Sequence, residues 1–127
     1  QAQVEGPLSG LSLAKELRQR METVLKLDEG YQGGSAFMVL GRLDVELPKM
    51  LGGDPERAVK TLERGLRYGE NNSLLRLRLA EAYLKVKRPE DARREVKYIL
   101  DMKPHPDFLP EYKESAEGAK QLLERRL

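Results

Sequence analysis

The chain has 127 residues, enough for one domain, with 23 Lys and Arg against 21 Asp and Glu and a net charge of +2. The two signs alternate along the sequence, which is typical of solvated helix faces and argues against the concentrated basic surface of a nucleic-acid-binding protein. The absence of cysteine excludes disulfides and thiolate metal sites, and no apolar run approaches the ~20 residues of a membrane-spanning helix.

The composition predicts an all-α protein, because Leu, Ala, Glu, Lys and Arg dominate and no alternating strand pattern occurs. Residues 1–11 contain Gly6, Pro7 and Gly10 and are expected to form an irregular lead-in. Residues 12–127 are expected to form a single helical domain.

Helix starts and stops divide this domain. Ser12 and Ser73 are predicted N-caps, and Asp54 is predicted to cap a helix that has Pro55 at its first position. The expected helices span, approximately, residues 12–28, 35–47, 55–68, 73–87, 89–102 and 111–126.

The sequence contains an internal repeat. The segments that open with Pro55 and Pro89 lie 34 positions apart, which is the period of tetratricopeptide repeats. The best repeat is 73–106, although Arg76 stands where this motif usually has a large apolar residue. The residues that fit its large and small positions are Leu79, Ala80, Tyr83, Ala92, Val96, Ile99 and Pro104.

The preceding unit is less regular. Leu40 and Gly41 fit the motif, and Gly65 stands where a small residue allows close helix contact, but residues 47–53 are an insertion. The first helix resembles the second half of a still earlier unit. We therefore predict tetratricopeptide-like hairpins in a short α-solenoid: one helix, two hairpins and a C-terminal capping helix.

Several short segments are more specific than the repeat. They are Gly-Arg-Leu at 41–43, Glu-Leu-Pro at 46–48, Gly-Gly-Asp at 52–54, Ala58, and the tail Pro-Asp-Phe-Leu-Pro-Glu at 106–111. Together they resemble the T component of tripartite ATP-independent periplasmic (TRAP) transporters, a tetratricopeptide-like bacterial family. The resemblance covers about residues 33–127.

This resemblance implies an accessory protein that docks a solute-binding partner for small organic or apolar ligands, and that can form oligomers. It also implies a periplasmic or membrane-associated location, reached through an N-terminal segment missing from this sequence. A cytoplasmic location is the alternative.

Nothing in the sequence predicts an enzyme, a metal site or a cofactor. His105 is the only histidine and lies between two prolines, with no second ligand at metal-binding spacing. The Gly-rich segment 30–34 follows a helix and lacks the Lys-Ser/Thr pair of a phosphate loop, so it is interpreted as a helix end.

The candidate site is the inner face formed by the first helices of successive hairpins, which in solenoids binds partners. Mixed apolar and charged groups there favour another protein or a peptide over nucleic acid. Arg42 and Glu81 replace the asparagines that hold a C-terminal carboxylate in chaperone-binding relatives. The candidate residues are Met38, Arg42, Leu74, Leu77, Arg78, Glu81 and Lys85.

Two functions stay open at this point. In the first, the chain is a scaffold, with Leu77 as the apolar anchor for a protein partner and Arg42, Arg78 and Lys85 as the polar rim. In the second, it carries a small apolar ligand in a pocket lined by Met38, Val39, Leu74 and Leu77 and sealed by the last helix. A third interpretation is that the last helix simply covers these leucines.

Overall fold

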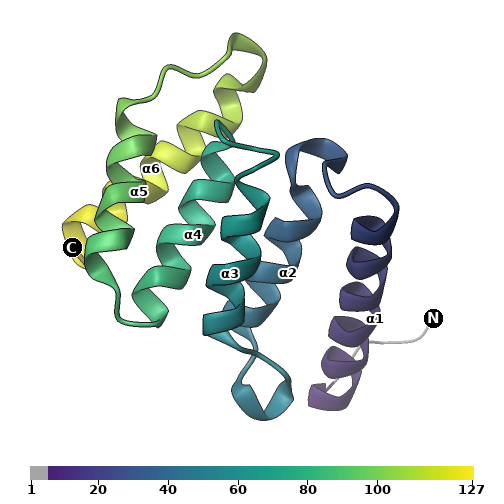
Figure 1. Cartoon of the computed structure of the whole chain (residues 1–127). Coiled ribbons are helices and arrows are strands. Elements are labelled where there is room, and N and C mark those ends of the chain that lie inside the picture. Colours follow the sequence, from purple (N-terminus) through teal and green to yellow (C-terminus); the bar gives the residue numbers. More distant parts are fainter. Residues whose placement is uncertain (1–5) are drawn as a thin grey trace.

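The computed structural model describes residues 6–127, and within that range all regular secondary structure is helical (Figure 1). The all-α prediction is confirmed. Three short 3-10 helices, η1 (Tyr31–Gly33), η2 (Lys49–Leu51) and η3 (Pro106–Phe108), lie in the connections. The α-helices are α1 (Gly6–Leu27), α2 (Ser35–Glu46), α3 (Pro55–Gly65), α4 (Ser73–Lys85), α5 (Pro89–Asp101) and α6 (Leu109–Arg125).

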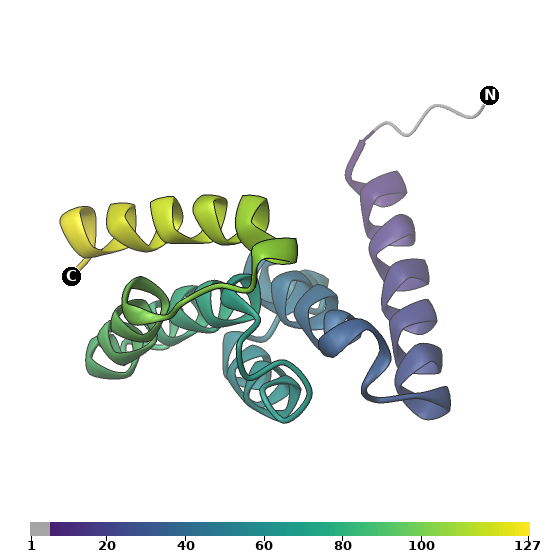
Figure 2. The ribbon, with the colours of Figure 1, turned by 90° about the horizontal axis from the view of Figure 1, so that it is seen from above.

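The helices stack in the order of the chain. The hairpins α2–α3 and α4–α5 pack side by side, α6 packs on both α4 and α5, and α1 packs against α2 at the other end (Figures 1 and 2). This is the predicted solenoid-like arrangement of one helix, two hairpins and a capping helix. The assignment of the hairpins to the tetratricopeptide class stays a prediction.

Two helices begin earlier than the sequence analysis expects. α1 begins at Gly6, so the expected irregular lead-in is wrong for residues 6–11, while residues 1–5 lie outside the described range. Likewise α6 begins at Leu109, before the expected Glu111. In both cases a proline lies in the first helical turn, where no N–H is needed, and so it does not delay the helix.

The N-cap of α4 is Asn72 and not the predicted Ser73. The side chain of Asn72 accepts a hydrogen bond from the backbone N–H of Leu75 at 3.1 Å, and Ser73 is the first helical residue. The predicted cap of α3 is confirmed, because Asp54 accepts from the backbone N–H of Arg57 at 3.1 Å.

Small residues bring α2 and α3 unusually close. A Cβ on Gly41 of α2 would lie 2.5 Å from Cγ of Leu62, and a Cβ on Gly65 of α3 would lie 2.8 Å from Cβ of Phe37. Each helix thus supplies one glycine that admits a large side chain of the other. The close contact predicted at Gly65 is confirmed.

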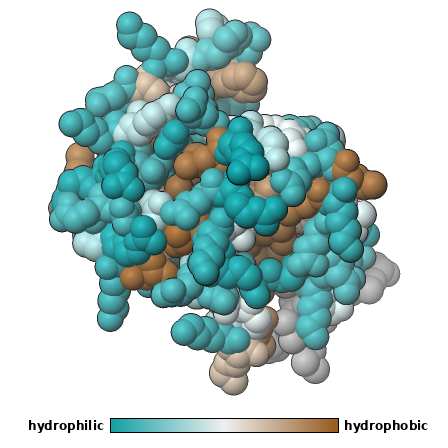
Figure 3. All heavy atoms as spheres, viewed as in Figure 1, coloured by the Kyte–Doolittle hydropathy of each residue, from teal (hydrophilic) through white to brown (hydrophobic). Residues whose placement is uncertain are grey.

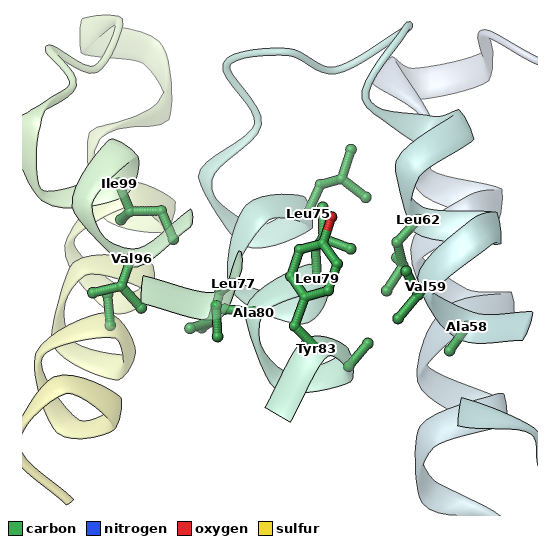
Figure 4. Packing of buried hydrophobic residues seen from close by; sticks show 13 residues of the cluster. Ala58, Val59, Leu62, Leu75, Leu77, Leu79, Ala80, Tyr83, Val96 and Ile99 are labelled. Carbon is green, nitrogen blue, oxygen red and sulfur yellow. The ribbon is translucent and has the colours of Figure 1, made fainter. Parts of the chain in front are cut away.

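The best repeat also packs as its pattern predicts. Figure 4 shows its buried side chains between α3, α4 and α5, and Leu79, Ala80 and Ala92 have no exposed surface. Arg76, the departure from the motif, is satisfied in another way. Its guanidinium pairs with the buried Glu95 at 3.0 Å and lies 3.7 Å from the ring centre of Tyr98.

A buried carboxylate ties α1 to the two helices that follow. Asp44 of α2 is 1% exposed and accepts one hydrogen bond from Arg18 of α1, at 2.9 Å. It accepts two more from Arg57 of α3, at 2.9 and 2.7 Å. Arg57 also donates to the carbonyl of Gly52, so the same cluster holds the inserted segment between α2 and α3.

The glycine contact gives the first testable prediction. Gly41→Ala should lower the free energy of unfolding by about 1–3 kcal/mol, because its Cβ would collide with the branch point of Leu62 rather than with a flexible end. Urea unfolding followed by circular dichroism measures this. As a control, Gly10→Ala places the same methyl in a helix with nothing within 4 Å, and should raise stability by up to about 1 kcal/mol. Equal effects of the two substitutions would contradict the close contact.

The second prediction concerns the two arginines around Asp44. Arg57→Met removes two of the three hydrogen bonds to a buried charge and should cost about 3–5 kcal/mol of stability. Arg18→Met should cost less, because Arg57 still neutralises Asp44. Arg94→Met, in an exposed pair with Asp91, is the control and should change stability by less than about 1 kcal/mol. If Arg18→Met lowered the free energy of unfolding more than Arg57→Met, the conclusion that Arg57 is the main partner of Asp44 would be wrong.

Candidate functional site

The first helices of the two hairpins, α2 and α4, face the same side of the molecule, where α6 lies over α4 at one end and α1 projects at the other (Figure 2). We call this side the inner face. The outer side, with α3 in front of α2, is mostly hydrophilic, with apolar surface between the hydrophilic side chains and at a few protruding points on its edge (Figure 3). The inner face, unlike the outer side, is flanked by α6 at one end and by α1 at the other.

The predicted site residues differ in exposure. Arg42 and Lys85 are exposed, Met38 and Leu74 are half-buried, and Leu77 is only 6% exposed. Arg78 and Glu81 are half-buried on α4 and bond to each other, at 3.0 Å.

Charges of opposite sign alternate across the middle of the inner face. On α2, Nε of Arg42 donates to Glu46 at 2.8 Å, while on α4 Arg78 donates to Glu81. The hydrogen bond to Glu46 raises the pKa of Arg42, and the nearby carboxylate of Glu81 raises it further, which links the two helices. We call these four residues the charged band. It has no net charge, and the side chains of Arg42 and Glu46 are 55% and 60% exposed.

The last helix covers one predicted residue. A Cβ on Gly118 of α6 would lie 2.8 Å from Cδ2 of Leu77, so α6 lies directly on this leucine. Leu74 and Leu84 are half-buried and pack against the core. Leu77 is therefore covered while α6 is in place, and its predicted contact with a partner would require α6 to move. The interpretation that α6 covers it holds for this residue.

Exposed apolar residues occur instead on α1. Leu13 and Leu17 are 47% and 38% exposed. Both recur at helical spacing along α1, whose main neighbour is α2, and both lie off the side that α2 covers.

The best-formed hollows among residues 6–127 include two that lie away from the inner face. The first has a volume of about 480 Å³, is open to solvent, and is lined by residues of α5 and of the loops beside α5, including Tyr98 and Met102. The second lies between Glu56, Glu63 and Arg88. Neither is lined by any of the four residues proposed for an apolar carrier pocket, Met38, Val39, Leu74 and Leu77.

His105 has a local role. Its Nδ1 accepts a hydrogen bond from the backbone N–H of Asp107 at 3.1 Å, which caps η3. Among residues 6–127 no group of three or more His, Cys, Asp or Glu side chains is placed to hold a metal ion. In the same range no helix combines the length and apolar character needed to cross a membrane.

The chain was compared with known proteins and with models of protein families. A comparison with curated proteins gives no match. A family model described as TRAP transporter T-component matches residues 3–116, which is most of the chain and includes all of α1 to α5. The chain therefore belongs to the T-component family of TRAP transporters, a family of transporter accessory subunits.

Proposed function

We propose that this protein is a non-catalytic scaffold of a TRAP transport system, and that its inner face docks the solute-binding protein of that system. The family supports the accessory role and a periplasmic or membrane-associated place of action. The inner face supports docking to a protein, because it combines an exposed charged band with half-buried apolar groups such as Met38 and Leu74.

The observation that carries this proposal is the charged band itself. Its charges are already paired within the chain, and Arg42 and Glu46 keep more than half of their side-chain surface in water. Exposed pairs of this kind contribute little to folding stability and exchange readily for contacts with a partner. Such groups determine the rate and orientation of association more than the final affinity.

The same observations favour docking over carriage of a small apolar ligand. A carrier needs an enclosed apolar cavity. Three of the residues expected to line one are instead part of the core or packed against it: Met38 and Leu74 pack against the core, and Leu77 is covered by Gly118 of α6. The partner that we propose is accordingly a protein surface with both charges and apolar groups.

The test is the kinetics of association with the solute-binding protein of the same TRAP transporter. Arg42→Glu should slow association about fivefold or more at ~20 mM salt, and much less at ~500 mM, because salt screens charge steering. Arg42 is preferred to Arg78 for this test, since the side chain of Arg78 is only 23% exposed and bonds to Glu81.

The matched control is Lys60→Glu, the same charge reversal at an exposed position on α3, outside the inner face. It should associate like the unmodified protein at both salt concentrations. If Arg42→Glu and Lys60→Glu behave alike, or if no binding occurs at all, the proposal fails. Circular dichroism establishes that both variants are folded.

A further inference from the structure

One side of α1 has the residue spacing of a coiled-coil contact. Five positions follow each other at intervals of four, three, four and three residues, which is the 3.5-residue period with which two helices pack. Four of them are apolar and the central one is arginine. We call this set the α1 seam: Leu13, Leu17, Arg20, Val24 and Leu27.

The seam is open to solvent. Leu13, Leu17 and Leu27 are 47%, 38% and 82% exposed, the Arg20 side chain is 71% exposed, and Val24 is half-buried. Single exposed leucines are ordinary on protein surfaces, but a row of them at the period of helix packing is not. The row extends 14 residues along the helix, or about 21 Å, which matches two heptads of a partner helix.

The contacts of α1 show which way the seam faces. Arg18 of α1 bonds to Asp44. The pKa of Arg57 of α3 is raised first by its hydrogen bond to Asp44 and also by the nearby charge of Glu22 of α1, while Glu29, in the turn after α1, bonds to Arg64 of α3. These residues mark the flank of α1 that faces α3. At 100° per residue the seam lies on the opposite flank, beside the inner face.

We propose that the α1 seam packs against an amphipathic helix of the partner protein, and that this helix places an acidic residue opposite Arg20. The inference rests on the proposed function, because it assigns the contact that α1 adds to the partner docked on the inner face. The seam takes the role of apolar anchor that the buried Leu77 does not fill.

Charge argues for a helix of another protein rather than a second copy of this chain. Arg20 is the midpoint of the seam, so both a parallel pair in register and a symmetric antiparallel pair would bring two Arg20 side chains together. Like charges directly opposite each other are destabilising. An acidic side chain there would instead take over the exposed bond that Arg20 now makes to Glu16, at 2.9 Å.

The experiment uses the full chain and two synthetic helical peptides of about three heptads, a length sufficient for stable packing. Both have leucine at the contact positions, and they differ only in a central Glu or Lys. Fluorescence anisotropy should give about tenfold tighter binding of the Glu peptide, the scale of one well-placed charge pair. Arg20→Glu should reverse this preference.

Leu17→Glu should weaken binding of the Glu peptide at least tenfold, because it puts a charge into the apolar contact. Gln19→Glu introduces the same charge on the solvent-facing side of α1 and should bind like the unmodified chain. Equal binding of the two peptides, or an unaffected Leu17→Glu, would overturn the proposal. So would dimers in sedimentation that Leu17→Glu dissociates, because the occupant would then be a second copy.

The same variants separate this inference from the proposed function. If Arg42→Glu slows association with the solute-binding protein but Leu17→Glu does not increase its dissociation rate, docking on the inner face stands and the seam contact is wrong. If the peptides discriminate as expected but the solute-binding protein does not bind, the seam stands and the proposed partner is wrong.

Discussion

The buried carboxylate of Asp44 joins three helices, α1, α2 and α3, in one charged cluster. It takes hydrogen bonds from α1 and α3 through Arg18 and Arg57, and its backbone carbonyl accepts from the N–H of Asp54 at the start of α3. Removing such charges from water is costly, and buried pairs therefore specify geometry better than they add stability. Here the geometry specified is the direction in which α1 leaves the body, and hence the open end of the inner face.

The two ends of the solenoid are finished in different ways. At one end α6 lies across α4 and α5, inserts Gly118 over Leu77, and bonds Tyr112 to the carbonyl of Ile99 at 2.8 Å. At the other end α1 contributes half-buried residues to α2 but leaves Leu13 and Leu17 in water. A solenoid needs a polar outer surface at each terminus to stay soluble. Both ends keep some exposed apolar side chains, Leu109 and Leu123 on α6 and Leu13, Leu17 and Leu27 on α1, but those on α1 follow one another along one side of the helix.

Much of the fold was predictable because it depends on local rules. The caps and prolines that begin α3 and α5, and the glycines that allow α2 and α3 to approach, act through residues a few positions away. The covering of Leu77 was not predictable in the same way. It depends on the path of α6 after the prolines of residues 104–110, which sequence spacing does not determine.

Asp44 was also missed, although a signal existed. It follows Phe37 and Gly41 at intervals of four and three residues, on the helix face that is buried against α3. An acid at that position requires a partner, and Arg57 stands in the first turn of the following helix. Many other acids of this highly charged chain lie in exposed pairs, such as Glu90 with Arg93, so the two buried acids, Asp44 and Glu95, do not stand out in the sequence. For the candidate site, the inner face on α2 and α4 stays a prediction, and sequence spacing could not tell residues covered by α6, such as Leu77, from exposed ones such as Arg42.

The attachment of α1 has a further consequence for the order in which this protein loses structure. Helices α2 to α6 each pack on at least two others, whereas α1 depends mainly on α2 and on the Asp44 cluster. Regions with few neighbours open at a lower free energy than the rest, and their amide hydrogens exchange sooner. If α1 detaches, Arg57 still holds Asp44, so the remaining body keeps its buried charge neutralised. A ligand that bridges α1 and the inner face would therefore add its binding free energy to the least stable part of the molecule, and α1 would gain the most protection from exchange.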